Sequence, residues 1–337
     1  MAVLAAASVA LSSCNGFIYE DQGDCDPYYK VRFVYDMNMK YTDAFPQEVN
    51  SVTLYLVDPA TGNVVWQKHE SGEALHSADY LMDVDVKPGD YTLLAWAGDG
   101  HRTHFSIPEA QQHRLLQCTL LRERADDNSA VVTHDIDRLY HGKLENQDFP
   151  QEQGVHIYTV PLIKNTNDVQ VVLQHISGAP VDHNKFVFTI SDENGLMDWD
   201  NSLMPDEKIT YHAWSVRSGT ASIGDEGSGE DAPSRALGEF SAAVAEHTVA
   251  RLMEDHRNTC RLTVYNKEKG EPVFSIPMIQ YCLLVKSEHH RDMTDQEYLD
   301  RQDSYSMVFF LDEGDRWIDT HIFINSWKIV INSSKPL

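Results

Sequence analysis

The feature that most limits how this chain can fold is an alternation of apolar and polar residues with a period of two. Val31 and Phe33 flank Arg32, and similar spacing recurs along most of the 337 residues. Stretches of this kind, rich in β-branched and aromatic residues, are typical of strands that bury one face. Pro88-Gly89 and Asn194-Gly195 supply turn signals. Helical signals are few, so the pattern predicts an all-β protein with a sandwich-like architecture.

One interruption divides this pattern. The polar run Lys164-Asn165-Thr166-Asn167 separates two sets of strand-like segments, and a chain of this length commonly forms two domains. We therefore expect two tandem β-sandwich domains, at residues 29–164 and 165–337. The predicted core residues are Val31, Phe33, Leu54, Leu56 and Trp96 in the first domain, and Val171, Phe188, Phe309 and Trp327 in the second.

The last quarter of the chain contains one clear helix start. Residues 273–284 are predicted as a strand, and Thr294-Asp295-Gln296-Glu297 then fits a capping box that opens a short helix over 295–302. The tail has alternating apolar residues on both sides of a break at 325–326. We interpret it as a strand pair or a bulged strand that closes the second domain. The alternative is that the tail donates a strand to a partner. Its apolar residues are Ile322, Ile324, Trp327, Ile329 and Ile331.

The first ten residues carry no charge and are rich in Ala, Val and Leu. This run is too short to span a bilayer and fits the apolar region of an export signal. No basic residue precedes it, so we expect the true start upstream of Met1. Leu11-Ser12-Ser13-Cys14 follows and resembles a bacterial lipobox, in which the chain is cut before the cysteine and the thiol is acylated. We predict a signal peptide at 1–13, lipidation of Cys14 and a tether at 14–28. The alternative is an Ala-rich helix with a chance cysteine.

Four further cysteines are compatible with disulfides. Outside the cytoplasm an even number of cysteines permits bridges. The pairings Cys25–Cys118 and Cys260–Cys282 are favoured because each joins two cysteines on the same side of the predicted domain boundary. Buried free thiols are the alternative.

The charge of the chain argues against some partners. There are 27 Lys and Arg residues against 52 Asp and Glu residues, which gives a formal net charge of −25. Such a surface repels phosphate backbones, so nucleic-acid binding is disfavoured.

No motif for catalysis or for a cofactor stands out. The spacing of His101 and His104 lacks the third ligand that a zinc site needs, and His289-His290 is interpreted as exposed. Asp83 and Asp85 lie on one side of a strand beside a turn, where carboxylates are usually solvated. Phosphate-binding, nucleophile-elbow and dinucleotide motifs are not found in the sequence. We therefore expect no enzymatic activity, no cofactor and no metal site.

Five stretches resemble one protein family. They are CDPYYKVRFVYDMNMKYTDAFPQEVNSVTLYLVD, VKPGDYTLLAWAG, LYHG, DQEYLDRQDSYSMVFFLD and INSWKIVIN. They are similar to the fimbrillin-like, FimB-type anchor lipoproteins of Bacteroidetes. The resemblance implies two transthyretin-like β-sandwich domains with few short helices, and no enzymatic activity. It implies a surface-exposed, lipid-anchored outer-membrane protein that ties a fimbrial shaft to the cell and influences its length. The partners would be shaft subunits and membrane lipid, and the N-terminal strand would be retained because it follows the lipid.

A surface glycan-binding lipoprotein is the competing class. Such a protein would also have a lipobox and β-sandwiches, and it would stack exposed Trp or Tyr side chains on sugars. Three aromatic side chains in one coplanar, exposed platform would favour this alternative. Core packing explains most of the six tryptophans more simply.

Overall fold

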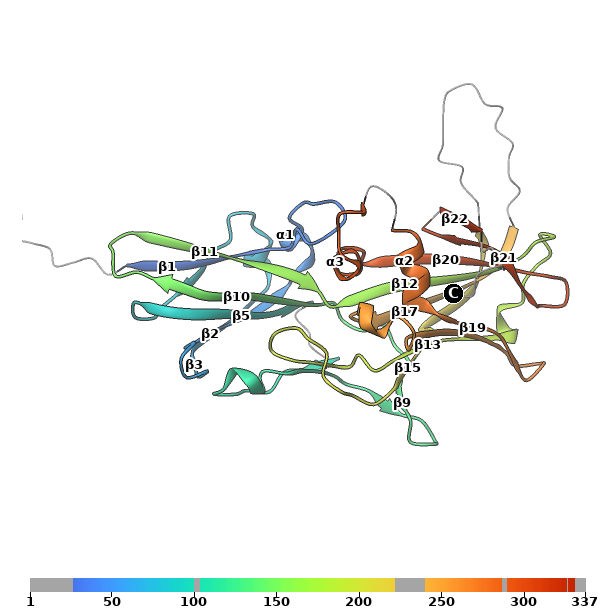
Figure 1. Cartoon of the computed structure of the whole chain (residues 1–337), viewed down its shortest axis with the longest axis horizontal. Helices are drawn as coiled ribbons and strands as arrows, with labels where there is room; N and C mark the ends of the chain where they lie inside the picture. Colours follow the sequence, from blue (N-terminus) through green and yellow to red (C-terminus); the bar gives the residue numbers. More distant parts are fainter. Residues whose placement is uncertain (1–26, 100–103, 222–239, 287–289, 326, 331–337) are drawn as a thin grey trace, which may run out of the picture.

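The computed structural model describes residues 27–99, 104–221, 240–286, 290–325 and 327–330. Strands dominate these ranges and the helices are short, which confirms the all-β prediction. Figure 1 shows an elongated molecule, with one large sheet toward one end and two further sheets toward the other. No helix in these ranges is long and apolar enough to cross a membrane.

The first sheet has seven strands and curls on itself. Strands that are distant within it share one core, in which Val31 and Phe33 pack with Leu54 and Leu56. All four are predicted core residues, and all four are buried. In order across the sheet, the strands are β3 (Val64–Ser71), β2 (Ser51–Val57), β5 (Gly89–Gly98), β10 (Leu139–Phe149), β11 (Val155–Lys164), β1 (Tyr28–Val34) and β4 (Met82–Val84).

Two six-stranded sheets form a sandwich around a second core. Val171, Phe188 and Phe309 lie in this core, as predicted. One sheet contains β16 (Ser215–Ala221), β17 (Phe240–Ala250), β12 (Thr166–His175), β20 (Ser304–Leu311), β21 (Trp317–Ile324) and β22 (Trp327–Val330). The other contains β19 (Glu271–Pro277), β18 (Arg261–Asn266), β13 (Phe186–Asp192), β15 (Ile209–His212), β9 (Ala130–Val132) and β8 (Glu123–Arg124).

Strand β5 is buried on both faces. Leu93 and Ala95 face the first core, whereas Leu94 and Trp96 face the second. The indole nitrogen of Trp96 donates a hydrogen bond to the carbonyl oxygen of Leu116 at 3.2 Å. Trp96 is therefore a core residue, but its ring belongs to the second core rather than to the first. The reason is the alternation along β5, which directs Leu94 and Trp96 away from the curled interior.

Some strand pairs join segments from both predicted domain ranges. Strand β9 pairs in parallel with β15, although it precedes residue 164. A small third group consists of β14 (Leu196–Met197), β7 (Cys118–Leu120) and β6 (Phe105–Ser106), and it combines the two ranges in the same way. The division of the chain at 164/165 stays a prediction.

The helical segments are short and lie between strands. The predicted helix is α3 (Asp295–Arg301), and the Thr294 hydroxyl accepts a hydrogen bond from the Glu297 backbone nitrogen at 3.0 Å. The Glu297 carboxylate instead contacts Arg301, so only half of the capping box forms. The strand predicted at 273–284 ends at Pro277 and is followed by α2 (Met278–Leu284). The other helical segments are α1 (Phe45–Glu48) and 3-10 turns at Glu73–His76, His113–Leu115, His183–Lys185 and Glu254–His256.

Candidate functional site

The predicted lipidation site Cys14 lies outside the described residues, as does Cys25. Cys260 and Cys282 are free thiols, so the predicted bridge between them is not formed. Burial raises the pKa of both thiols, which keeps them protonated and unreactive. They pack as small apolar side chains, which was the alternative interpretation. Cys118 is buried on β7, and its pairing with Cys25 stays a prediction.

The C-terminal segment forms a strand pair, as predicted. Ile322 and Ile324 on β21 are fully buried in the second core. In the backbone register, Ile324 lies opposite Trp327 and Ile322 lies opposite Ile329, which places β22 at the edge of its sheet. The side chains of Trp327 and Ile329, and all of Ile331, lie outside what the structure describes. An edge position leaves one side of β22 without a neighbouring strand in the described sheet.

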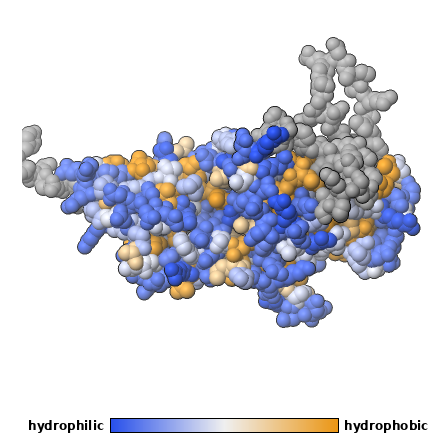
Figure 2. Space-filling view, viewed as in Figure 1, coloured by the Kyte–Doolittle hydropathy of each residue, from blue (hydrophilic) through white to orange (hydrophobic). Residues whose placement is uncertain are grey.

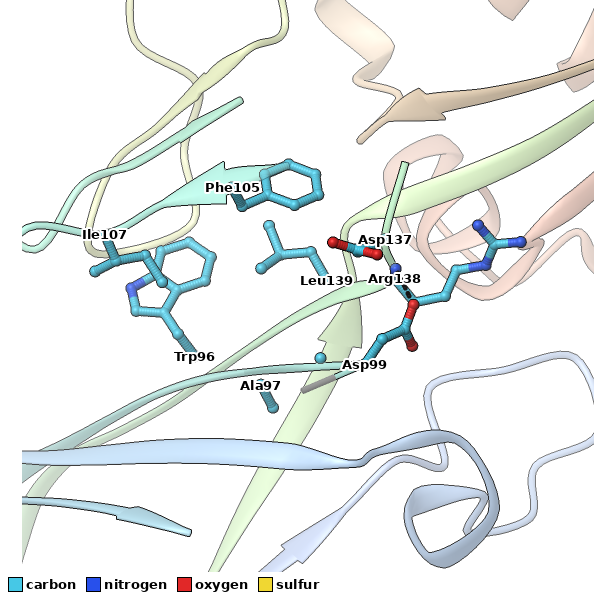
Figure 3. A pocket seen from close by; sticks show the side chains of 9 residues that line it. Trp96, Ala97, Asp99, Phe105, Ile107, Asp137, Arg138 and Leu139 are labelled. Carbon is cyan, nitrogen blue, oxygen red and sulfur yellow. Dashed lines mark hydrogen bonds between the residues drawn. The ribbon is translucent and has the colours of Figure 1, made fainter. Parts of the chain in front are cut away.

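A small pocket lies where β5 ends and β10 begins, as Figure 3 shows. Trp96, Phe105 and Leu139 form an apolar wall, and Asp99 and Arg138 lie at its polar end. The Asp99 carboxylate accepts a hydrogen bond from the backbone nitrogen of Arg138 at 2.8 Å. This contact fixes the start of β10 and occupies one carboxylate oxygen. The pocket therefore joins structural elements and offers no evident catalytic group.

Ion pairs connect the first sheet to the sandwich. The ammonium of Lys164 lies 3.3 Å from the Glu48 carboxylate and 3.2 Å from the Asp303 carboxylate. The Arg301 guanidinium covers the ring of Tyr41 at 4.6 Å from its centroid. Because α1 and Tyr41 belong to the first sheet region and Asp303 and Arg301 to the sandwich region, these contacts fasten the two regions together.

A buried network lies beside these contacts. Arg251 and Asp300 form two parallel hydrogen bonds, of 2.9 Å and 2.8 Å, and both residues are more than nine-tenths buried. The side-chain amides of Asn165 and Asn201 exchange hydrogen bonds of 2.6 Å and 3.1 Å. Arg251 also donates to the carbonyl oxygen of Asn201, which links the two pairs. The sequence singles out only the polar run that contains Asn165, and no sequence signal marks Arg251 or Asp300.

Two buried histidines bear on the stability of this region at acidic pH. The Nε2 of His141 donates a hydrogen bond to the carbonyl oxygen of Trp199 at 2.9 Å, and His247 lies on β17. Burial lowers the pKa of each imidazole to about 4. The unfolded chain binds these protons near pH 6.5, so it holds more protons than the folded chain between pH 6.5 and 4. The stabilisation that these two histidines contribute is therefore complete above pH 6.5, and it is lost as the pH falls from 6.5 to 4.

We expect His141→Gln to reduce this acid sensitivity. In the wild type, His141 should contribute about 3 kcal/mol to the difference in unfolding free energy between pH 7 and pH 4. Urea denaturation at both values measures that difference, and it should shrink by a similar amount in the variant. The matched control is His156→Gln, because His156 bonds the Glu152 carbonyl oxygen at the surface. An unchanged pH dependence in His141→Gln would contradict the assignment.

The histidines and carboxylates that the sequence offers as candidate metal ligands or catalytic acids do not come together in one site among the described residues. His101 and His289 lie outside the described residues, and no group of three metal-ligating side chains occurs among those described. Asp83 is exposed on the edge strand β4 and pairs with Lys30 at 2.5 Å. The neighbouring groove lies between β4 and the other edge strand, β3, and is lined by Trp66 and Lys68 among others. Asp83 thus serves as a solvated ion-pair partner.

The exposed aromatic residues do not form a shared platform. They come from separate segments, and no ring contact joins any two of them within the described chain. Figure 2 shows a mostly hydrophilic face on which hydrophobic residues are scattered. The three-aromatic arrangement that would favour a glycan-binding platform is therefore not found among these residues. The exposed aromatics are Tyr28, Tyr41, Trp214 and Tyr265.

Comparison with known proteins shows to which family this chain belongs. The family model described as fimbrillin-A associated anchor proteins Mfa1 and Mfa2 matches residues 22–333. The chain belongs to this family. The members named by the model are fimbrial anchor proteins rather than enzymes, which agrees with the sequence-based resemblance.

Individual proteins match this chain over nearly its whole length. The minor fimbrium anchoring subunit Mfa2 of Porphyromonas gingivalis is 22% identical over 329 residues, which cover 95% of this chain and 90% of that protein. The solved structure of a candidate adhesin from Bacteroides thetaiotaomicron is 34% identical with a TM-score of 0.78, covering 93% of this chain and 100% of that one. A candidate polysaccharide-binding protein from the same organism is 29% identical with a TM-score of 0.75, covering 91% and 99%.

Proposed function

We propose that this chain is a surface-exposed outer-membrane lipoprotein that anchors a fimbrial shaft to the cell and influences its length. The observation that carries the proposal is the anchor-protein family match over residues 22–333. The anchoring subunit Mfa2 is similar over 95% of the chain, so the likeness is not confined to one domain. The partners are fimbrial shaft subunits on one side and membrane lipid on the other.

The proposed attachment runs through the N-terminus. Residues 1–13 act as the signal peptide, Cys14 carries the lipid, and the tether predicted at 14–28 ends at Tyr28, the first residue of β1. The strand that follows suits this role, because β1 pairs with β11 in parallel and with β4 in antiparallel orientation. It also buries Val31 and Phe33 in the first core. Force on the tether would therefore act on a strand with a neighbour on each side, so we expect β1 to be retained.

The proposed contact with the shaft involves the C-terminal segment. Strand β22 lies at a sheet edge, and strand addition at an edge supplies backbone hydrogen bonds that do not depend on sequence. Ile322 and Ile324 are fully buried and belong to the domain itself. The part available for donation is therefore Trp327 to Ile331 rather than the whole alternating segment.

Cells that lack this protein should release their fimbriae. We expect fimbrial shaft protein to move from the cell fraction to the medium, and electron microscopy should show a change in fimbrial length. Immunoblots of both fractions measure the release. Re-expression of the wild-type chain is the control and should return fimbriae to the cell. Fimbriae that stay attached in the absence of the chain would contradict the anchoring role.

A variant lacking residues 325–337 extends the same experiment to the C-terminal segment. Because β22 is an edge strand and the buried part of β21 ends at Ile324, we expect the variant to fold. Folding with release of fimbriae would support strand donation. Loss of folding would show that the segment is domain structure, and intact anchored fimbriae would reject donation.

A further inference from the structure

The outer face of the β12–β17–β20 sheet contains a trough that ends at an exposed tryptophan. Trp214 is 40% exposed, and its backbone nitrogen donates to the carbonyl oxygen of Glu246 at 2.9 Å. In the strand register Glu246 lies opposite Gln170, and Gln170 lies opposite Ser306. These residues alternate with core-facing ones, so their side chains share the outer face. They form a polar row across three strands, with the indole at one end.

The row retains hydrogen-bonding groups that nothing in the described chain uses. The Ser306 hydroxyl donates to the side-chain oxygen of Gln170 at 3.1 Å, which leaves the Gln170 amide nitrogen available. One Glu246 oxygen accepts from Arg217 at 2.6 Å, and one Asp168 oxygen lies 2.9 Å from Arg138. The second oxygen of each carboxylate has no partner among these residues. The trough therefore offers one donor and two acceptors beside an aromatic face.

The charge of the trough selects the kind of ligand. Asp135, Asp168 and Glu246 contribute three negative charges, and Arg138 and Arg217 contribute two positive ones. The excess is one negative charge, on a chain whose formal charge is −25. Phosphate, sulfate and uronic-acid groups would be repelled. A neutral ligand rich in hydroxyl groups meets no such penalty and can bond both carboxylates and the amide.

We propose that this trough binds a neutral oligosaccharide, with one sugar ring stacked on Trp214. A pyranose presents an apolar C–H face that suits an indole, and a rim of hydroxyls that both donate and accept. The carboxylates of Asp168 and Glu246 accept from hydroxyls, and the Gln170 amide donates to one. Binding sites commonly combine an apolar wall with a few oriented polar groups in this way. This activity is separate from shaft anchoring, because it needs only one copy of the chain and no fimbria.

Affinity electrophoresis of the purified full chain tests the proposal. Gels contain a soluble neutral polysaccharide (a glucan, a mannan or a galactan), or an anionic one (polygalacturonate or heparin). The wild type should be retarded by at least one neutral polymer and by neither anionic polymer. Trp214→Ala should weaken the interaction about tenfold, since stacking and burial of an aromatic ring contribute on the order of one such factor. Gln170→Ala should also weaken the interaction with the polysaccharide, although it leaves the indole in place.

The matched control is Tyr265→Ala, which removes an exposed aromatic of similar accessibility (37%) from β18 in the opposite sheet. This variant should migrate like the wild type in every gel. The proposal is overturned if no neutral polymer retards the wild type, or if Trp214→Ala is retarded as strongly. It is also overturned if binding that depends on Trp214 is found only with polylysine, because the trough would then recognise a cationic peptide. Release of fimbriae is read in cells and is independent of these gels.

Discussion

Replacing Arg251 with Met should lower the free energy of unfolding by about 3–5 kcal/mol, because it leaves a buried carboxylate without its charge partner. Asp300 is 8% exposed and receives two hydrogen bonds from the Arg251 guanidinium. The remaining side-chain donor to this carboxylate in the described chain is the amide of Gln296, at 2.9 Å. Urea denaturation near pH 7 measures the loss. The variant also removes the contact with the Asn201 carbonyl oxygen, which loosens the junction network.

Two further variants separate charge burial from a general effect of mutation. Arg251→Met combined with Asp300→Leu removes both charges and should recover most of the stability, because the unpaired buried charge is then gone. Arg257→Met breaks the pair with Asp295, whose side chains are 41% and 33% exposed, and should cost no more than about 1 kcal/mol. If Arg251→Met and Arg257→Met lose the same free energy of unfolding, the buried pair does not have the proposed role in stability.

The sequence predicts strands well where one face is buried. Val31 and Phe33 on β1 alternate with more exposed neighbours, and they lie in the expected core, as Val171 on β12 does. The prediction fails at 278–284, where a short apolar run forms α2. Met278, Ile279 and Cys282 are all buried there, at a spacing that one face of a helix produces. Periodicity alone does not separate helix from strand in so short an apolar run.

Pairings between distant segments are not readable from local pattern. Strand β9 joins β15 about eighty positions later in the chain, and no residue in either strand specifies that partner. The same holds for the trough. Its residues come from the loop before β10, from β12, β17 and β20, and from the positions just before β16 and just after β21. Trp214 is visible in the sequence as one of six tryptophans, and only the strand register places it beside Glu246 and Gln170.

Changing Cys14 to Ala should move the protein from the membrane fraction to the soluble fraction. The Leu-Ser-Ser-Cys sequence would lose the thiol that receives the lipid, and each buried methylene of an acyl chain contributes about 0.8 kcal/mol to membrane binding. Loss of the acyl chains therefore removes essentially all of the proposed attachment. Fractionation with immunoblotting measures the distribution, and mass spectrometry of the wild type should show the acyl mass on Cys14. Folding should be unaffected, because the first described strand begins at Tyr28.

Cys25→Ala is the matched control, because this cysteine lies in the same N-terminal segment without a lipobox before it. It should stay with the membranes. In fimbriated cells, Cys14→Ala also separates two proposed roles of the protein, which are attachment to the membrane and binding of the shaft. If Cys14→Ala is released together with fimbriae that still carry it, the lipid holds the assembly to the cell and the folded domains hold the shaft. If the Ala variant still fractionates fully with membranes and the wild type carries no acyl group, the lipid anchor is wrong, and attachment must come from the folded domains.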